Sequence, residues 1–178
     1  MRFETKQKEQ ERMSRVWDIY RDSVYQDCLK KNEEYEKDRI YCRHGYDHLL
    51  AVARLAYLFS LERGYDLEKD LIYAAALLHD VGRWKQYADG TPHDEAGALI
   101  GEGILSRTGF DDEEKQMITA AIRSHRGAGA SVKENDPRLS RLQEVLYDAD
   151  KMSRDCYACD ALDSCNWAAE KKNLQIMW

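Results

Sequence analysis

Apolar residues recur at helical spacing along most of this chain. In the segment 4–36, Val16, Ile19, Tyr20 and Val24 lie among many charges, as in an amphipathic helix. Later segments keep the same spacing, and no run alternates with the period of two that half-buried strands show. The pattern predicts helices over residues 4–36, 46–63, 66–79, 92–107, 112–125 and 137–150. The chain is therefore expected to be all-α.

Residues that commonly begin or end helices stand at the predicted boundaries. They are Gly64 after the second helix, Asp66 before the third, Thr91 with Pro92 before the fourth, Asp111 or Asp112 before the fifth, and Asp136 with Pro137 before the sixth. The segment 79–90, HDVGRWKQYADG, is predicted to be a loop.

Composition favours one domain built from long helices. The chain has 178 residues, of which 43% are apolar, with only two prolines and ten glycines. This length suits a single core better than two. We expect one domain over 1–178, with a core of about 40–155, a long N-terminal helix in 1–39 and a cysteine-containing tail in 156–178. The long first helix could serve as an interface between copies in a homo-oligomer.

The charge pattern narrows the set of partners. The net charge of −6 argues against broad nucleic-acid binding and against adhesion to anionic membranes. It leaves room for an anionic substrate, because a metal ion and a few local cations can reverse the sign inside a cleft. The chain begins with charged residues, has no apolar signal region and has no run long enough to span a bilayer. We expect a cytoplasmic protein with no membrane partner, whose five cysteines are reduced thiols.

Each of five predicted helices carries an imidazole or a carboxylate on its apolar stripe. The stripes are His48, Val52, Leu55 and Phe59; Ile72, Ala76 and His79; His93, Gly97, Ile100 and Ile104; Ile118, Ile122 and His125; and Leu139, Leu142, Leu146 and Asp150. A lone histidine on such a stripe is usually a hydrogen-bonded core residue, but five coincidences favour a common role. Buried carboxylates at Asp80 and Asp150 need cations or several donors, and a divalent metal would satisfy them together with the imidazoles.

The ordered set His48, His79-Asp80 and Asp150 resembles the H…HD…D signature of the HD superfamily of metal-dependent phosphohydrolases. The flanking segments HLLAVARLA, ALLHDVGR and YDADK fit as well, so the resemblance covers roughly residues 40–155. It implies an HD-type helical bundle of five to six core helices, here with the long N-terminal helix added. It also implies that these four residues bind a metal and that the reaction is phosphoester or phosphoanhydride hydrolysis.

His93 and His125 extend the resemblance to the binuclear members, whose order is H…HD…H…H…D. This implies that Asp80 bridges two metals and that His93 and His125 help to hold the second. Two cations about 3.5–4 Å apart can activate water and neutralise phosphoryl oxygens together. In the alternative, the two histidines hydrogen-bond to phosphate beside a single metal. The donor types do not distinguish iron, manganese, magnesium, nickel, cobalt and zinc.

The implied mechanism is the attack of a metal-activated water on phosphorus, with Asp80 or a nearby histidine taking the proton. Arg83 is expected to bind a phosphate oxygen, and Lys151 to bridge to Asp80 or to substrate. The substrate would be a nucleotide or another small phosphoester. Two other hypotheses use the same positions: an HD-fold di-iron oxygenase, and a non-catalytic nucleotide-binding or sensory module.

The remaining candidates are less specific. Cys156, Cys159 and Cys165 form a C-x2-C-x5-C pattern, which supplies three thiolates and needs Cys28 or Cys42 to complete a zinc site. In the alternative, these cysteines are small buried apolar residues. His44 stands four residues before His48 and is expected to lie outside the ligand set.

Overall fold

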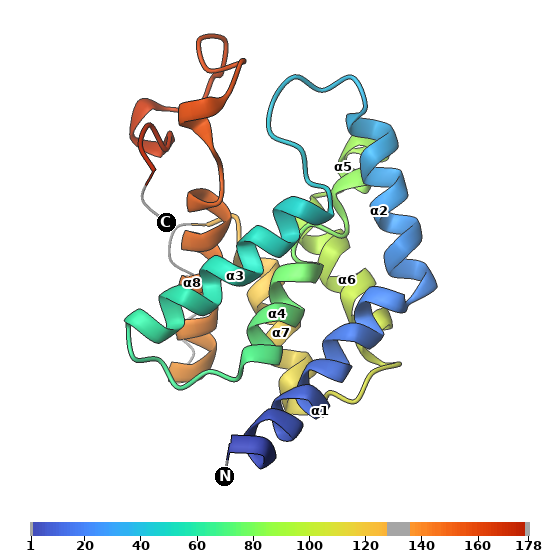
Figure 1. The fold of residues 1–178 in the computed structure, drawn as a ribbon. Helices are drawn as coiled ribbons and strands as arrows, with labels where there is room; N and C mark the ends of the chain where they lie inside the picture. Colours follow the sequence, from blue (N-terminus) through green and yellow to red (C-terminus); the bar gives the residue numbers. More distant parts are fainter. Residues whose placement is uncertain (1, 128–135, 177–178) are drawn as a thin grey trace.

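The computed structural model describes residues 2–127 and 136–176, and within these ranges the chain forms helices and no strands. The α-helices are α1 (Arg2–Arg21), α2 (Ser23–Glu36), α3 (Tyr46–Glu62), α4 (Lys69–Leu78), α5 (Arg83–Asp89), α6 (His93–Leu105), α7 (Asp112–Ser124) and α8 (Pro137–Met152). Two short 3₁₀ turns, Cys156–Ala158 and Ala169–Lys171, follow in the tail. The all-α prediction is confirmed (Figure 1).

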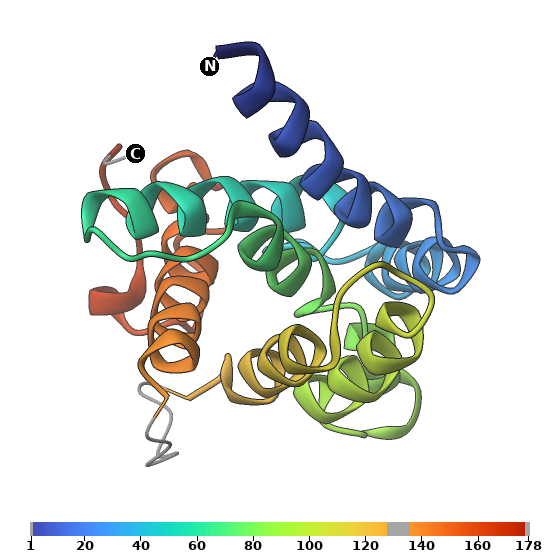
Figure 2. The same cartoon turned by 90° about the horizontal axis from the view of Figure 1, so that it is seen from below.

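Helix α4 forms the centre of the core. It packs against α3, α1, α7, α8 and α6, and Figure 2 shows it between α3 on one side and the α6–α7 pair on the other. Every residue from Asp70 to Leu78 except Tyr73 is buried, as expected of a helix that is covered all round. His79, one of the predicted metal ligands, follows directly at the C-terminal end of α4. The packing of α4 in the core therefore fixes the position of this imidazole.

The predicted helix over 4–36 is wrong in one respect, because the chain breaks it at Asp22. The backbone of Asp22 is extended, and its carboxylate accepts hydrogen bonds from the N–H groups of Val24 and Tyr25. Asp22 is therefore the N-cap of a second helix. Its other carboxylate oxygen accepts a 2.7 Å hydrogen bond from Arg107, which ties the break to the end of α6. Two helices, not one long helix, cover this side of the core.

The predicted loop over 79–90 is also wrong in part, because Arg83–Asp89 is the helix α5. Two features stabilise it. Gly90 takes a left-handed conformation with φ of 81° at its C-cap, which glycine adopts without strain. Lys85 and Asp89 form an i,i+4 ion pair of 2.7 Å along it. Only the turn 79–82 remains, and it leads from α4 into α5.

Most predicted boundaries agree with the structure. Asp111 caps α7 in a reciprocal capping box with Glu114, Asp136 caps α8 ahead of its proline, and Gly64 follows the end of α3 with φ of 63°. Two starts differ. The N-cap of α4 is Glu68 where Asp66 was predicted, and α6 begins at His93 with Pro92 as N-cap, one residue later than predicted.

Beyond α8 the tail runs as turns rather than helix, and it extends at the same end of the molecule as the loop 37–45 (Figure 1). Tyr41 of that loop donates a 3.2 Å hydrogen bond to the carbonyl of Ser164 in the tail. Loop and tail together form the rim above the ends of α3, α4 and α8, where the candidate site lies.

Candidate metal centre

His79 and Asp80 occupy the tight turn between α4 and α5. Their side chains are 0% and 2% exposed in relative terms, and the turn is closed by a 3.0 Å hydrogen bond from Arg83 N–H to the Asp80 carbonyl. The buried amide of Asn32 in α2 clamps this turn. It donates a 3.1 Å hydrogen bond to the Asp80 carbonyl and accepts one of 2.8 Å from Trp84 N–H.

One group of donor atoms forms around the Oδ2 side of Asp80. It consists of His48, His79, Asp80 and Asp150, one donor atom of each lying within 4.8 Å of all the others. His79 Nε2 lies 3.2 Å from Asp80 Oδ2, and His48 Nε2 lies 3.4 Å from Asp150 Oδ1. Such separations suit donors that surround one ion at about 2.0–2.2 Å each.

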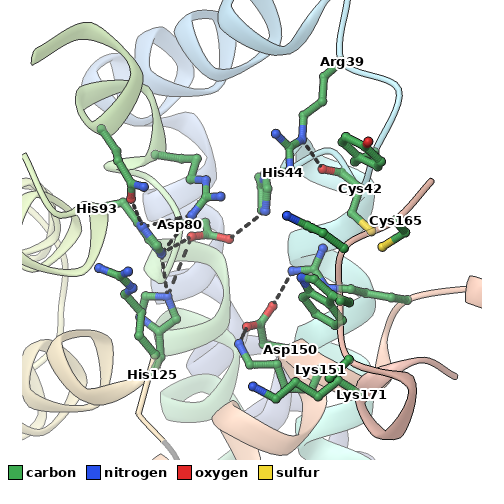
Figure 3. Close-up of a pocket in the computed structure, with 18 residues that line it drawn as sticks. Arg39, Cys42, His44, Asp80, His93, His125, Asp150, Lys151, Cys165 and Lys171 are labelled. Atoms are coloured by element: carbon green, nitrogen blue, oxygen red, sulfur yellow. Dashed lines mark hydrogen bonds and ion pairs between the residues drawn. The ribbon is translucent and has the colours of Figure 1, made fainter. Parts of the chain in front are cut away.

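A second group forms on the other oxygen of Asp80. It consists of Asp80, His93 and His125, with His93 Nε2 3.2 Å and His125 Nε2 3.7 Å from Asp80 Oδ1. The two Nε2 atoms lie 3.2 Å apart. The structure therefore brings all six sequence-predicted ligands together, with Asp80 shared between the two groups. Figure 3 shows four of them, Asp80, His93, His125 and Asp150, where they line the pocket.

Hydrogen bonds to the far nitrogens orient three of these imidazoles. His79 Nδ1 lies 2.7 Å from the Ala76 carbonyl, and His125 Nδ1 lies 2.6 Å from the Ile122 carbonyl. His93 Nδ1 lies 2.5 Å from Gln86 Oε1. Donation from Nδ1 in each case leaves an Nε2 lone pair directed at the site, which is how metal-binding histidines are usually supported.

The buried polar atoms fit a divalent cation. Among the described residues, His48 Nε2, His79 Nε2 and Asp80 Oδ1 are buried without a hydrogen-bond partner, a costly arrangement unless another group satisfies them. The carboxylates and imidazoles present are the donors that first-row divalent metals prefer. The residues thus fit a divalent cation, and Asp80 turns one carboxylate oxygen toward each of the two groups of donors.

Asp80 and Asp150 are ionised although they are buried. Burial opposes ionisation of Asp80 and Asp150, yet the surrounding histidines hold the pKa of both carboxyls well below the usual range. Burial lowers the pKa of His79, but Asp80 and Asp150 outweigh it and raise that pKa to about 10. Burial lowers the pKa of His48 to about 4, so this imidazole is neutral and its lone pair is free at neutral pH.

His44 lies closer to the site than the sequence predicted. Its Nδ1 lies 2.5 Å from Glu36 Oε1, and its backbone N–H donates a 2.6 Å hydrogen bond to Glu36 Oε2. Tyr87 donates to the same carboxylate at 2.6 Å. The opposite ring nitrogen, Nε2, lies 4.0 Å from Asp80 Oδ2. His44 is therefore not among the clustered ligands, but it lines the pocket beside them.

The candidate metal centre opens into a pocket of about 450 Å³. Pockets of this volume commonly bind small molecules. Cationic side chains surround it although the chain as a whole is acidic. They are Arg39, Arg83, Arg126, Lys151, Arg154 and Lys171. Figure 3 shows Arg39, Lys151 and Lys171 approaching from separate parts of the chain. The pocket is thus positive around a cluster of metal-type donors, a combination that suits an anionic ligand.

The two predicted catalytic cations, Arg83 and Lys151, both line this pocket. Lys151 pairs with Asp150 and not with Asp80. Arg83 contacts the ring of His93, its Nη1 lying 3.0 Å from Nδ1, and donates to the hydroxyl of Tyr87. The sequence reasoning missed Arg154, which is buried and donates a 3.0 Å hydrogen bond to Asp150 Oδ1. It stands four residues after Asp150, just beyond the end of α8 at Met152, where the helical pattern no longer indicates which way a side chain points.

Two further observations bear on the sequence predictions. Among the described residues, neither cluster of potential ligands contains a cysteine. Within 2–127 and 136–176, no helix is long and apolar enough to cross a membrane.

Comparison with known proteins agrees with the geometry. The family model described as HD domain matches residues 45–155, which include all six clustered ligands. A protein of Clostridium beijerinckii that carries no functional name is 39% identical over 93% of this chain and 100% of its own length. YueE of Bacillus subtilis, whose name proposes a phosphohydrolase, is 29% identical over 64% of this chain and 68% of its own length. An uncharacterised protein of Methanocaldococcus jannaschii is 32% identical over 49% of this chain and 48% of its own length. No solved structure matches the chain with significance.

Proposed function

The chain belongs to the HD domain family, and we propose that it hydrolyses a phosphoester bond in a small phosphorylated molecule, a nucleotide being the first candidate. One observation carries the proposal. The Asp80 carboxylate is shared between two groups of imidazoles at the floor of a pocket that six cationic side chains line. The similarity to a relative whose name proposes a phosphohydrolase supports the same reaction class.

We propose that His48, His79, Asp80 and Asp150 hold one divalent ion and that His93 and His125, with Asp80, hold a second. When bound, the ions would activate water and stabilise negative charge on phosphoryl oxygens. The sharing of Asp80 supports the two-ion form over a site in which His93 and His125 bind only phosphate. Both of its oxygens already face imidazole nitrogens at 3.2 Å.

The cationic side chains would bind and orient the phosphate group. Arg154 and Lys151 are partly engaged with Asp150, so they also offset the negative charge of that carboxylate. Arg39, Arg126 and Lys171 approach from the rim of the pocket. An arginine guanidinium can bind two phosphate oxygens at once, which gives orientation as well as affinity.

His44 is placed to hold or move a proton in this reaction. Glu36 binds its Nδ1 side, so Nε2 faces the pocket and the Asp80 carboxylate. A carboxylate behind an imidazole fixes its tautomer and its orientation, as in many acid–base sites. We propose His44 as a proton carrier, in addition to Asp80, for the attacking water or the leaving group.

The test begins with protein purified without added metal. Its metal content is measured, and the chelator-treated protein is reloaded separately with manganese, magnesium, iron, cobalt, nickel or zinc. Each form is screened for phosphate release from phosphomonoesters and nucleotides, and for cleavage of phosphodiesters. Asp80→Asn should lose metal and activity, whereas Asp112→Asn, at a 92% exposed side chain, should keep both.

Three results would contradict the proposal. If Asp80→Asn kept both metal and full hydrolysis, the site assignment would be wrong. Iron in the purified protein with substrate-dependent O₂ uptake, and no phosphate release, would favour an HD-fold di-iron oxygenase. Tight nucleotide binding without turnover for any metal would favour a sensory module.

A further inference from the structure

Four of the five cysteines line one pocket between the loop 37–45, the start of α3 and the tail. They are Cys42, Cys156, Cys159 and Cys165. The fifth, Cys28, lies in α2 and does not line this pocket. A separate pocket thus gathers soft ligands next to the nitrogen and oxygen donors of the HD centre.

The tail turns direct three of these thiols to one side. Successive backbone hydrogen bonds join Cys159 N–H to Cys156 carbonyl at 3.3 Å, Leu162 N–H to Cys159 carbonyl at 3.1 Å, and Cys165 N–H to Leu162 carbonyl at 3.3 Å. These are separate turns, because the backbone of Cys159 between the first two is extended, with φ of −92° and ψ of 120°. Cys156, Cys159, Leu162 and Cys165 all line the same pocket.

Cys42 faces this row from the loop. Its carbonyl accepts a 2.8 Å hydrogen bond from Arg39, and the hydroxyl of neighbouring Tyr41 binds the Ser164 carbonyl in the tail. Figure 3 shows the sulfur atoms of Cys42 and Cys165 pointing toward one another. The structure therefore selects Cys42, and not Cys28, as the residue that can join the C-x2-C-x5-C row.

Apolar burial does not explain why the tail is ordered. Between residues 155 and 176 the only buried residue is Cys156. Fixing the backbone costs about 1–2 kcal/mol per residue, and a segment with one buried side chain recovers little of that through the hydrophobic effect. Short metal-bound segments commonly replace a missing core with a thiolate site.

We propose that Cys42, Cys156, Cys159 and Cys165 bind one zinc ion as a tetrathiolate site that fastens the tail to the loop before α3. Zinc is bound by four thiolates at about 2.3 Å in tetrahedral geometry. No three of these sulfur atoms lie within 4.8 Å of one another, so zinc binding draws the tail turns toward Cys42. Arg154 and Arg43 line the pocket and offset the negative charge of the thiolates.

The zinc site would also hold the rim of the HD pocket in place. Cys42 and Cys165 line both pockets, and the tail supplies Trp167 and Lys171 to the HD pocket. Arg154 lies beside Trp167, with its guanidinium carbon 5.0 Å from the ring centroid. Binding of zinc in one pocket would therefore position side chains that contact ligand in the other. The zinc proposal does not depend on the hydrolytic one.

The test uses the full chain, purified under reducing conditions. A mercurial reagent is titrated into it in the presence of a zinc-sensitive dye. We expect one zinc per chain to be released as four thiols are blocked. Cobalt substituted at this site should give intense visible absorption and near-ultraviolet thiolate-to-cobalt charge transfer. Cys42→Ser and Cys165→Ser should lose that absorption, whereas Cys28→Ser and Asp80→Asn should keep it.

Several outcomes would overturn the zinc proposal. The first is zinc-free protein with five freely reactive thiols and no cobalt charge transfer. The second is retention of the cobalt spectrum in Cys42→Ser. The third is iron with acid-labile sulfide in place of zinc. If Cys42→Ser fails to fold, the mercurial titration of wild-type protein and the Cys28→Ser spectrum still decide. If the protein binds zinc at the four cysteines but releases no phosphate from any substrate, the proposed function is rejected and the zinc proposal stands.

Discussion

The side-chain amide of Asn32 donates a 3.1 Å hydrogen bond to the backbone carbonyl of Asp80. This contact joins α2 to the turn that carries the shared carboxylate. The same amide accepts from Trp84 N–H at 2.8 Å, so one fully buried side chain satisfies backbone groups on both sides of Gly82. The position of Asp80 depends on α2 as much as on α4.

Asn32→Ala should therefore destabilise the fold and weaken metal binding. It leaves the Trp84 N–H without its partner and removes one of the two hydrogen bonds to the Asp80 carbonyl, which costs roughly 1–3 kcal/mol. Urea unfolding measures the loss, and metal titration of the folded variant should show weaker affinity, about 10–100-fold as for other supporting residues of metal sites. Gln10→Ala, at an exposed position in α1, is the control and should change neither. Unchanged metal affinity in a destabilised Asn32→Ala would separate Asn32 from the site.

Gly82→Ala should disrupt the packing of α6 on the same turn. A Cβ at Gly82 would lie 2.3 Å from Gly97 N and 2.8 Å from the carbonyl of His93, both backbone atoms that cannot move alone. We expect a loss of about 3 kcal/mol in unfolding free energy, together with reduced binding at His93. Gly103 lies in α6, and a Cβ added there would have open space around it. Gly103→Ala should therefore be neutral or stabilising by up to about 1 kcal/mol. Equal effects of the two variants in thermal unfolding would refute the packing argument.

The apolar stripes predicted which side chains meet at the site, because each helix has to turn its stripe toward α4. His48, His93 and Asp150 come from three separate helices, and the stripes alone account for the burial of His93 and Asp150 and the partial burial of His48. Local propensity also predicted the capping residues Asp111 and Asp136. These features depend on short-range chemistry that a sequence displays directly.

What the stripes did not predict depends on long-range contacts. Asp22 ends α1 because its carboxylate caps α2 and pairs with Arg107, 85 residues later. The pocket cations come from the loop 37–45, α5, α8 and the tail, and solvated arginines of this kind show no periodic signal. The contact between Glu36 and Nδ1 of His44, which orients the imidazole at the site, leaves no mark in the sequence pattern.

His44→Gln should reduce turnover while leaving the metal content unchanged. The imidazole faces the pocket but lies outside both ligand clusters, so its loss removes a proton carrier and no ligand. General acid–base groups contribute about 10²–10⁴-fold, and we expect kcat to fall by about 10²-fold, with one limb of its pH profile lost. The measurements are metal analysis and the pH dependence of kcat. A loss of bound metal in His44→Gln would make His44 a ligand.

Glu36→Gln should remove a pH-dependent part of the stability. Burial raises the pKa of Glu36, but His44 and Tyr87 outweigh this and lower it to about 2 from a usual value of 4.5. The carboxylate therefore stabilises the fold above about pH 4.5, and that stabilisation is lost as the pH falls toward 2. At neutral pH the difference between wild type and Glu36→Gln should be about 3 kcal/mol, shrinking between pH 4.5 and 2. Chemical unfolding at several pH values tests this, and a constant difference would contradict it.

Metal removal should destabilise the protein most at high pH. In the absence of metal, the carboxylates of Asp80 and Asp150 raise the pKa of His79 to about 10. A raised histidine pKa stabilises the fold fully below the unfolded value of about 6.5, and that contribution is lost as the pH rises toward 10. A divalent ion takes the place of the proton, so metal binding releases protons and strengthens with pH.

Manganese suits this experiment because it prefers imidazole and carboxylate donors over thiolates, so it reports on the HD centre and not on the cysteine pocket. Protein treated with chelator should lose stability between pH 6.5 and 9.5. Added manganese at about 100 times its dissociation constant should restore about 2.7 kcal/mol, and the concentration needed should fall as the pH rises. Asp112→Asn should behave as wild type. Asp80→Asn should show no restoration and a smaller pH-dependent loss, because only Asp150 still raises the pKa of His79. Stabilisation by manganese at the same concentration at pH 6.5 and pH 9.5 would mean that no proton is displaced from His79.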